Sequence, residues 1–142
     1  MQSYFFLTSD TVSFHARLIT RDYPKYQMVI PEKSKNVFTI NTEKFKDYLK
    51  RFKITTEKKK PLKIQFDIEK LTFINETMKA ELFNFNNIAE SMTIGFNINY
   101  LLDAVKHIDS EKIIIKYNSE LAPCVIQSST GNCFNIVMPM KI

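Results

Sequence analysis

One order of predicted secondary structure occurs twice in this chain, and this repeat limits the possible folds more than any other feature. Residues 37–83 read as a strand, an amphipathic helix and three further strands, and residues 92–140 repeat that order. The repeat lies in the spacing of apolar residues, since identity between the halves is slight. We therefore predict an α+β fold made of two β-α-β-β-β units.

Each predicted helix has one apolar face. The first helix begins at a cap on Asn41 or Thr42. Its apolar residues recur at helical spacing: Phe45, Tyr48, Leu49 and Phe52. The second helix covers about residues 98–108, with a similar face: Leu101, Leu102, Val105 and Ile108. We expect each unit to have its own sheet with one apolar face. A helix and one sheet bury too little surface alone, so we expect the units to join, with two helices on one face and antiparallel sheets behind.

Six of the predicted strands follow the helices, three in each unit. They cover residues 62–68, 70–75, 78–83, 112–117, 123–127 and 133–140. In the first of them Leu62, Ile64, Phe66 and Ile68 alternate toward the core. The last strand contains Pro139, which lacks an N–H, so we expect it at a sheet edge or bulge. The apolar end of this last strand either packs into the core and stabilises it or forms a wall of a surface groove.

The segment before the repeat divides into two parts. Residues 4–7 and 12–19 read as a hairpin, and the following stretch contains Pro24 and Pro31 among many charges. We predict a terminal hairpin at 1–20, a linker at 21–33 and a domain at 34–142. Apolar residues along the linker are expected to anchor it: Tyr23, Tyr26, Met28, Val29 and Ile30.

The positive charge of the chain is concentrated in residues 41–60. This segment has eight cations and three anions, a difference of 5 that equals the net charge of +5 for the whole chain. One interpretation is a solvated helix with surface ion pairs, Glu43–Lys46 and Asp47–Arg51. The other interpretation is a surface that contacts phosphates without recognising a base sequence. In that case the chain would be a standalone, sequence-nonspecific nucleic-acid-binding protein.

The sequence contains no recognisable motif for catalysis or cofactor binding. His15 and His107 are not at metal-ligand spacing from other ligands, and Gly95 and Gly131 are isolated. Cys124 and Cys133 are expected on the two arms of one hairpin as free thiols in a reducing cytosol. No apolar stretch is long enough to span a membrane, and the first residues do not resemble a signal peptide. We therefore expect a cytoplasmic binding protein rather than an enzyme, without metal or cofactor.

Three blocks of this sequence together resemble the bacterial beta sliding clamps, the beta subunits of DNA polymerase III. Residues 95–105, GFNINYLLDAV, resemble the family block G-F-N-x-x-Y-L-L-D-x-L. Residues 23–31, YPKYQMVIP, resemble the segment F-P-D-Y-x-x-V-I-P that links the family's second and third domains. Residues 137–142, VMPMKI, resemble its C-terminal signature. The blocks occur in family order.

The resemblance implies a DNA-clamp fold and a non-enzymatic processivity factor of the replicative polymerase. Residues 34–142 would be the third clamp domain, and residues 1–20 the last hairpin of the second. Family members form rings of two head-to-tail subunits around double-stranded DNA, with helices lining the hole. Without a first domain, we expect this chain alone not to close a homodimeric ring. The resemblance implies DNA-facing roles for Lys44, Lys46, Lys50, Arg51, Lys53 and Lys106. A nucleoid-associated location in the cytoplasm follows.

The resemblance also implies a pocket for short peptides of partner proteins, namely the polymerase III alpha subunit, clamp-loader subunits and repair proteins. The family's peptides have a pattern close to Q-L-x-L/F. Matching positions in this chain come from the linker, the second helix, a loop and the final strand. They are Pro24, Val29, Asn97, Tyr100, Leu121, Pro123, Ile136, Val137, Met138, Pro139, Met140 and Lys141. Methionine side chains suit such a surface because they adapt to different partners.

Overall fold

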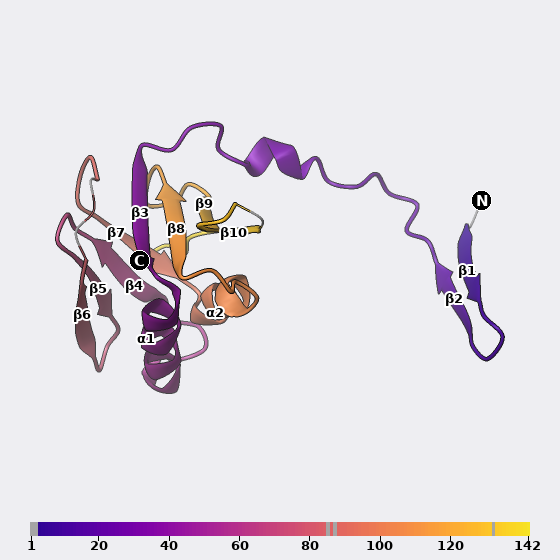
Figure 1. Cartoon of the computed structure of the whole chain (residues 1–142), viewed down its shortest axis with the longest axis horizontal. Helices are drawn as coiled ribbons and strands as arrows, with labels where there is room; N and C mark the ends of the chain where they lie inside the picture. The colour runs from indigo at the N-terminus through magenta and orange to yellow at the C-terminus, as the bar shows by residue number, and fades with distance from the viewer. Residues whose placement is uncertain (1–2, 85, 87, 132) are drawn as a thin grey trace.

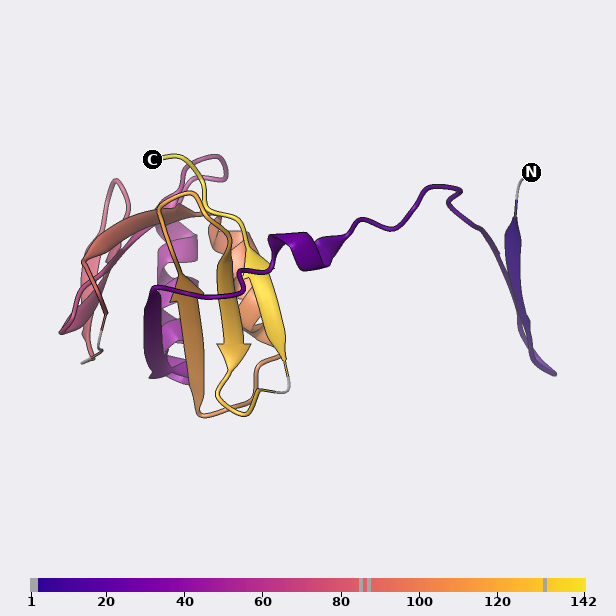
Figure 2. The ribbon, with the colours of Figure 1, turned by 90° about the horizontal axis from the view of Figure 1, so that it is seen from above.

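The computed structural model describes residues 3–84, 86, 88–131 and 133–142, which form a hairpin, a linker and a body (Figure 1). The hairpin pairs β1 (Tyr4–Thr8) with β2 (Ser13–Arg17), and it projects away from the body in two perpendicular views (Figures 1 and 2). The first two positions of the predicted hairpin segment, Met1 and Gln2, lie outside the described residues.

A side chain of the body, Asn118, binds the backbone at the end of the linker. Asn118 donates from its amide to the carbonyl oxygen of Lys33 at 3.0 Å, and its Oδ1 accepts from the backbone N–H of Lys35 at 2.6 Å. Before this point the linker contains a short 3-10 helix, η1 (Tyr26–Val29). The expectation of apolar anchors is wrong for most of the linker, since Tyr23 and Met28 are 81% and 80% exposed. The reason is that the linker projects from the body with its hairpin (Figure 2).

The strands of the body form two antiparallel sheets. Sheet I has the order β10-β9-β8-β3 and sheet II the order β6-β5-β4-β7. The members of sheet I are β3 (Asn36–Asn41), β8 (Lys112–Tyr117), β9 (Cys124–Ser128) and β10 (Phe134–Val137). The members of sheet II are β4 (Leu62–Phe66), β5 (Lys70–Ile74), β6 (Lys79–Phe83) and β7 (Met92–Phe96).

The two repeat units exchange their first strands. β3 belongs to the first unit but pairs with β8 of the second, and β7 belongs to the second unit but pairs with β4 of the first. The expectation that each unit carries its own sheet is therefore wrong. Strand partners depend on long-range register, which apolar spacing within a strand does not specify. Because of the exchange, each four-stranded sheet contains one strand from the other unit.

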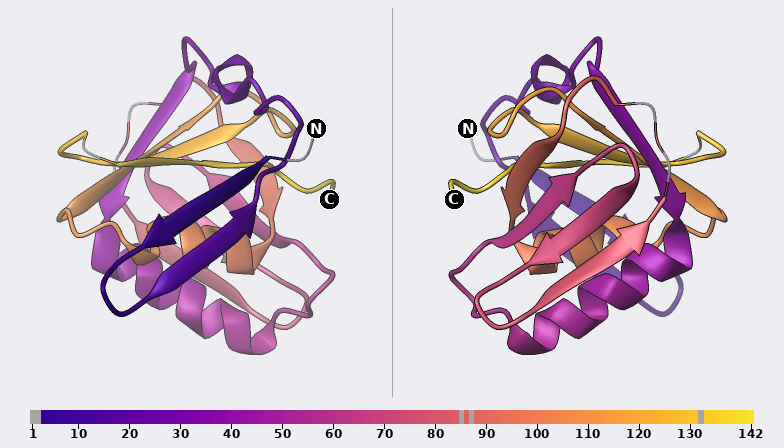
Figure 3. Two further views of the ribbon diagram at one scale, coloured as in Figure 1. Left: turned by 90° about the vertical axis from the view of Figure 1, so that its right-hand side faces the viewer. Right: turned by 90° about the vertical axis from the view of Figure 1, so that its left-hand side faces the viewer.

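The helices α1 (Thr42–Thr55) and α2 (Ile98–Lys106) lie side by side, with the sheets behind them (Figures 1 and 3). Both begin at an asparagine cap: Asn41 Oδ1 accepts from the N–H of Lys44 at 3.0 Å, and Asn97 Oδ1 accepts from the N–H of Asn99 at 2.9 Å. This arrangement confirms the predicted α+β fold with helices on one face.

Aromatic residues connect the layers of the core. Phe73 of β5 contacts three rings of α1, with centroid distances of 5.1 to 5.8 Å: Phe45, Tyr48 and Phe52. Between the sheets, Phe66 of β4 contacts Phe38 of β3 at 5.5 Å and Tyr117 of β8 at 4.5 Å. The predicted apolar face of α1 is therefore the buried face.

In the body, two strands are shorter than predicted by two or more residues, β4 and β10. β4 ends at Phe66, because the N–H of Asp67 already bonds to the carbonyl of Lys70 and closes the turn to β5. Ile68, predicted to face the core, is 57% exposed. β10 ends at Val137, two residues before Pro139, which cannot donate to a sheet ladder. α2 ends at Lys106, although Ile108 beyond it is still buried.

Candidate functional site

A surface groove of about 430 Å³ lies between α2 and β10, and we call it the α2–β10 groove. Seven residues line it: Tyr100, Asp103, Ala104, Asn135, Ile136, Val137 and Met138. Two of its largest side chains, Tyr100 and Met138, are 61% and 53% exposed. Exposed apolar side chains beside a hollow are available for contact with a partner.

A hydrogen bond connects the two walls of the α2–β10 groove. The amide of Asn135 in β10 donates to the carbonyl oxygen of Ala104 in the last turn of α2, at 2.7 Å. This carbonyl is among those that a helix end leaves without an intrahelical partner. On its other side β10 pairs with β9, where Val137 lies opposite Cys124. The groove therefore has one wall from a helix and one from an edge strand.

The tail, residues 138–142, continues from β10 to the other sheet. The N–H of Met140 donates to the carbonyl oxygen of Gly95 in β7 at 2.8 Å, which forms an isolated antiparallel bridge. The last two residues line a separate hollow of about 340 Å³ with Lys60 and Pro61. There the ammonium of Lys60 donates to the carboxylate of Glu76 at 2.6 Å, and this bond raises the pKa of Lys60.

The structure places four of the predicted peptide-pocket residues in the α2–β10 groove: Tyr100, Ile136, Val137 and Met138. Asn97 caps the helix that carries Tyr100. Pro139, Met140 and Lys141 belong to the tail. Leu121 and Pro123 lie in the loop before β9, and Pro24 and Val29 lie in the linker. Among the described residues, these eight do not line the groove.

Three groove residues were missed by the sequence analysis: Asp103, Ala104 and Asn135. Asp103 and Ala104 lie three and four positions after Tyr100, so helical spacing could have placed them on the same face. The sequence has no comparable signal for Asn135, because its role depends on the close approach of β10 to α2.

A third hollow, of about 530 Å³, lies between the helices, and we call it the inter-helix groove. Its lining is mainly charged: Glu43, Lys46, Lys50, Lys53, Leu102, Asp103, Val105 and Lys106. It contains four of the predicted DNA-facing residues. Asp103 borders both this groove and the α2–β10 groove.

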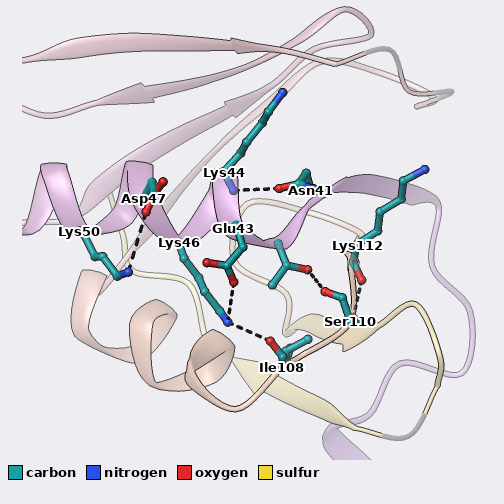
Figure 4. Close-up of polar contacts among 10 residues, drawn as sticks. Asn41, Glu43, Lys44, Lys46, Asp47, Lys50, Ile108, Ser110 and Lys112 are labelled. Carbon is teal, nitrogen blue, oxygen red and sulfur yellow. Dashed lines mark hydrogen bonds and ion pairs between the residues drawn. The ribbon is translucent and has the colours of Figure 1, made fainter.

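Ion pairs reduce the free positive charge of the inter-helix groove (Figure 4). Lys46 pairs with Glu43 at 3.2 Å and Lys50 pairs with Asp47 at 3.8 Å. Lys46 is mostly buried, with 14% of its side chain exposed, and it also donates to the carbonyl oxygen of Ile108 at 2.9 Å. Within the part of the chain that the structure describes, Lys53 and Lys106 form no ion pair.

Lys44 and Arg51 lie outside the inter-helix groove. Figure 4 shows Lys44 extending from α1 away from Lys46 and Lys50. Arg51 lies over the ring of Tyr48, 5.6 Å from its centroid. The predicted ion pair between Asp47 and Arg51 is wrong, because Asp47 pairs with Lys50 one position earlier, while the predicted Glu43–Lys46 pair is confirmed. α1 thus presents its cations on two sides.

No group of three or more His, Cys, Asp or Glu side chains that could hold a metal ion occurs among the described residues. No helix in that part of the chain is long and apolar enough to cross a membrane. Both cysteines are free thiols, and burial raises the pKa of Cys124 to about 12.

The sequence of this chain is similar to those of known proteins. The family model described as the DNA polymerase III beta subunit, C-terminal domain, matches residues 27–141. A beta sliding clamp of Rickettsia felis is 29% identical over 96% of this chain, and one of Rickettsia bellii is 30% identical over the same share. The chain spans about 40% of the length of these curated relatives.

Solved structures show the same fold. The DNA polymerase III beta subunit of Thermotoga maritima matches 98% of this chain and 40% of its own, with a TM-score of 0.85 and 22% identity. The Helicobacter pylori beta clamp bound to a DNA ligase peptide matches 97% of this chain and 38% of its own, with a TM-score of 0.82 and 22% identity. Both likenesses include the hairpin and linker as well as the body.

Proposed function

Because this chain belongs to the family of the DNA polymerase III beta subunit and carries its C-terminal domain, we propose that it acts as part of a DNA sliding clamp. In this role it binds partners rather than catalysing a reaction, in the cytoplasm at the nucleoid. The observation that carries the proposal is the family match over residues 27–141, which includes α2, β10 and the groove between them.

The α2–β10 groove is proposed to dock the clamp-binding peptides of partner proteins, such as polymerase and clamp-loader subunits. Its exposed Tyr100 and Met138 would contact the apolar side chains of the peptide. The structure of the Helicobacter pylori relative was solved with a DNA ligase peptide, which supports peptide binding as a property of that clamp. The remaining predicted positions, from Pro24 and Val29 to Lys141, are proposed to contribute to peptide binding from outside this groove.

The surface of α1 and α2 is proposed to face the DNA duplex. Lys53 and Lys106 would contribute most, because they form no ion pair with the residues that the structure describes. Lys44, Lys50 and Arg51 would add exposed charge, and Lys46 would act mainly between the helices. Ion pairs with Glu43 and Asp47 would keep the contact weak, as sliding along DNA requires.

The hairpin is proposed to complete a preceding clamp domain. Phe5, Leu7, Phe14 and Ala16 share one face of it, since Phe5 lies opposite Ala16 and Leu7 opposite Phe14. All but half-buried Ala16 are exposed in this chain. A sheet face of this composition suits the core of a domain. The division at 1–20, 21–33 and 34–142 would then separate the end of one domain, a linker and a whole domain.

The peptide proposal is tested by fluorescence anisotropy with a labelled peptide of pattern Q-L-x-L-F. We expect weak, saturable binding to the chain, and loss of binding when residues 138–142 are deleted. Met138→Ala should weaken binding by about 1–2 kcal/mol, because truncating a partly buried side chain removes part of the 1.5–3 kcal/mol of a full one.

The control for the peptide test is Ile68→Ala, which truncates an apolar side chain of similar exposure in the turn before β5. It should leave the peptide affinity unchanged. Absence of binding to the folded chain at millimolar peptide would contradict the proposed groove function.

The clamp proposal also predicts how the isolated chain behaves with DNA. Since a clamp holds DNA by encircling it, a short duplex should bind this chain barely at all. Tight binding that weakens steeply with salt would instead favour a standalone nucleic-acid-binding protein that uses residues 41–60. If binding is seen, a loss of affinity in the double variant Lys53→Ala/Lys106→Ala would show that the surface of α1 and α2 makes the contact.

A further inference from the structure

The tail bridges the two sheets at a position where the neighbouring strand has no side chain. Val137 is the last residue of β10 in sheet I, and Met140 is already bonded to Gly95 of sheet II. Only Met138 and Pro139 lie between these two attachments. On its other side Gly95 lies opposite Lys63 of β4, so its backbone is fixed in the sheet.

The path of the tail leaves no room for a side chain on Gly95. A Cβ atom there would lie 2.8 Å from the carbonyl oxygen of Met140 and 3.2 Å from Cβ of Pro61. It would also overlap with Cγ2 of Ile142. The Ile142 side chain could rotate away, but the Met140 oxygen belongs to the backbone and can move only with the tail. Any other residue at position 95 therefore displaces the tail.

Displacement of the tail would change the α2–β10 groove. Met138 lines the groove, and it is held between β9, through Val137, and β7, through Met140. Pro139 restricts the backbone further, because its ring fixes φ and biases the residue before it toward extended conformations. Met138 thus has a defined position beside α2 only while Met140 stays on Gly95.

We propose that Gly95 is a positioning residue for peptide binding: it seats the tail and so holds Met138 in the α2–β10 groove. Gly95 itself is buried and does not line the groove. The inference rests on the proposed peptide-binding function and adds a residue that acts through the tail.

The test compares Gly95→Ala with Thr93→Ala, a substitution in the same strand opposite Gln65 of β4. Hydrogen exchange should show that the Met140 amide loses protection in Gly95→Ala and keeps it in Thr93→Ala. Peptide affinity should fall about tenfold in Gly95→Ala only, which corresponds to 1.4 kcal/mol. Alanine in a strand is otherwise no worse than glycine, so the change in unfolding temperature should be small.

A double mutant separates positioning from a general loss of structure. If Gly95 acts through Met138, Gly95→Ala should weaken binding little further in a Met138→Ala background. Fully additive losses, or lost affinity with a protected Met140 amide, would overturn the inference. Unchanged affinity in Gly95→Ala would overturn it and leave the proposed function standing. A natural chain that binds no peptide would overturn the proposed function and, with it, this inference.

Discussion

Lys46 of α1 donates a hydrogen bond to the carbonyl oxygen of Ile108 at 2.9 Å (Figure 4). Ile108 is a buried residue that lies two positions after the end of α2. The same ammonium pairs with Glu43. A lysine that sequence spacing places among exposed cations therefore connects α1 to the segment that follows α2. The ammonium group of Lys46 therefore binds groups of the protein itself, whereas the side chain of Lys50 is 65% exposed to solvent.

We predict that Lys46→Met lowers the free energy of unfolding by about 1–2 kcal/mol, because it removes a charged hydrogen bond from a mostly buried site. Lys50→Met is the matched control, and its effect should stay within about 0.5 kcal/mol since its ion pair is exposed. Urea denaturation followed by circular dichroism measures both. Equal effects of the two substitutions would contradict the connecting role of Lys46.

At position 135, the stability of the protein should depend more on the hydrogen-bond donor than on the size of the side chain. Asn135→Ala removes the bond to the Ala104 carbonyl and should cost about 1 kcal/mol. Asn135→Asp keeps the shape but places a carboxylate against that carbonyl oxygen, so at neutral pH it should cost more than alanine. Thermal unfolding of both variants tests this order, and a less damaging aspartate would show that the hydrogen bond is unimportant.

Phe73 is predicted to be the residue of β5 on which α1 depends most. Phe73→Ala should lower the free energy of unfolding by about 3–5 kcal/mol, the range for large aromatic residues in a core. Phe83→Ala truncates the same side chain where it is 71% exposed and should change stability by about 0.5 kcal/mol or less. Guanidinium denaturation distinguishes them; a small effect of Phe73→Ala would mean that the three rings of α1 repack without it.

The cysteines should react at different rates with a thiol reagent at pH 8. Cys124 is buried and its pKa is raised from 9.0 to about 12, so the folded chain holds almost no Cys124 thiolate, whereas Cys133 is half-buried. One thiol should react in the native state and two in denaturant. Since the unfolded chain ionises Cys124 near pH 9.0 and the folded chain does not, stability should fall as pH rises from about 9 to 12. Cys124→Ser should remove the protected thiol, and rapid native reaction of two thiols would contradict the burial.

Local patterns predicted the elements of this fold well. The apolar spacing of α1 identified the buried residues Phe45, Leu49 and Phe52, and the predicted cap at Asn41 begins this helix. Errors occur where a neighbour in space decides. Ile68 continues the apolar alternation of β4, but a turn begins at Asp67 and leaves it exposed. Three cations lie three or four positions from Asp47 in the sequence, namely Lys44, Lys50 and Arg51, and only the structure shows that Lys50 is its partner.

For the candidate site, the sequence identified four of the seven residues of the α2–β10 groove. Tyr100 and the residues 136–138 were found through the family resemblance, and Asp103 and Ala104 were within reach of helical spacing. Asn135 was not, since its amide acts only because β10 lies against α2. The same holds for Gly95, whose importance depends on a tail more than forty positions later in the chain.

The sequence alone determined which segments are helices and strands, which faces of the helices are buried, and the family to which the chain is similar. These properties depend on the spacing of apolar residues within about ten positions and on short motifs. Only the tertiary structure decided that the units exchange β3 and β7, that Lys46 serves the helix contact, and that the tail crosses between sheets at Gly95. Each of these depends on pairs of residues far apart in sequence, whose contact is set by register and packing.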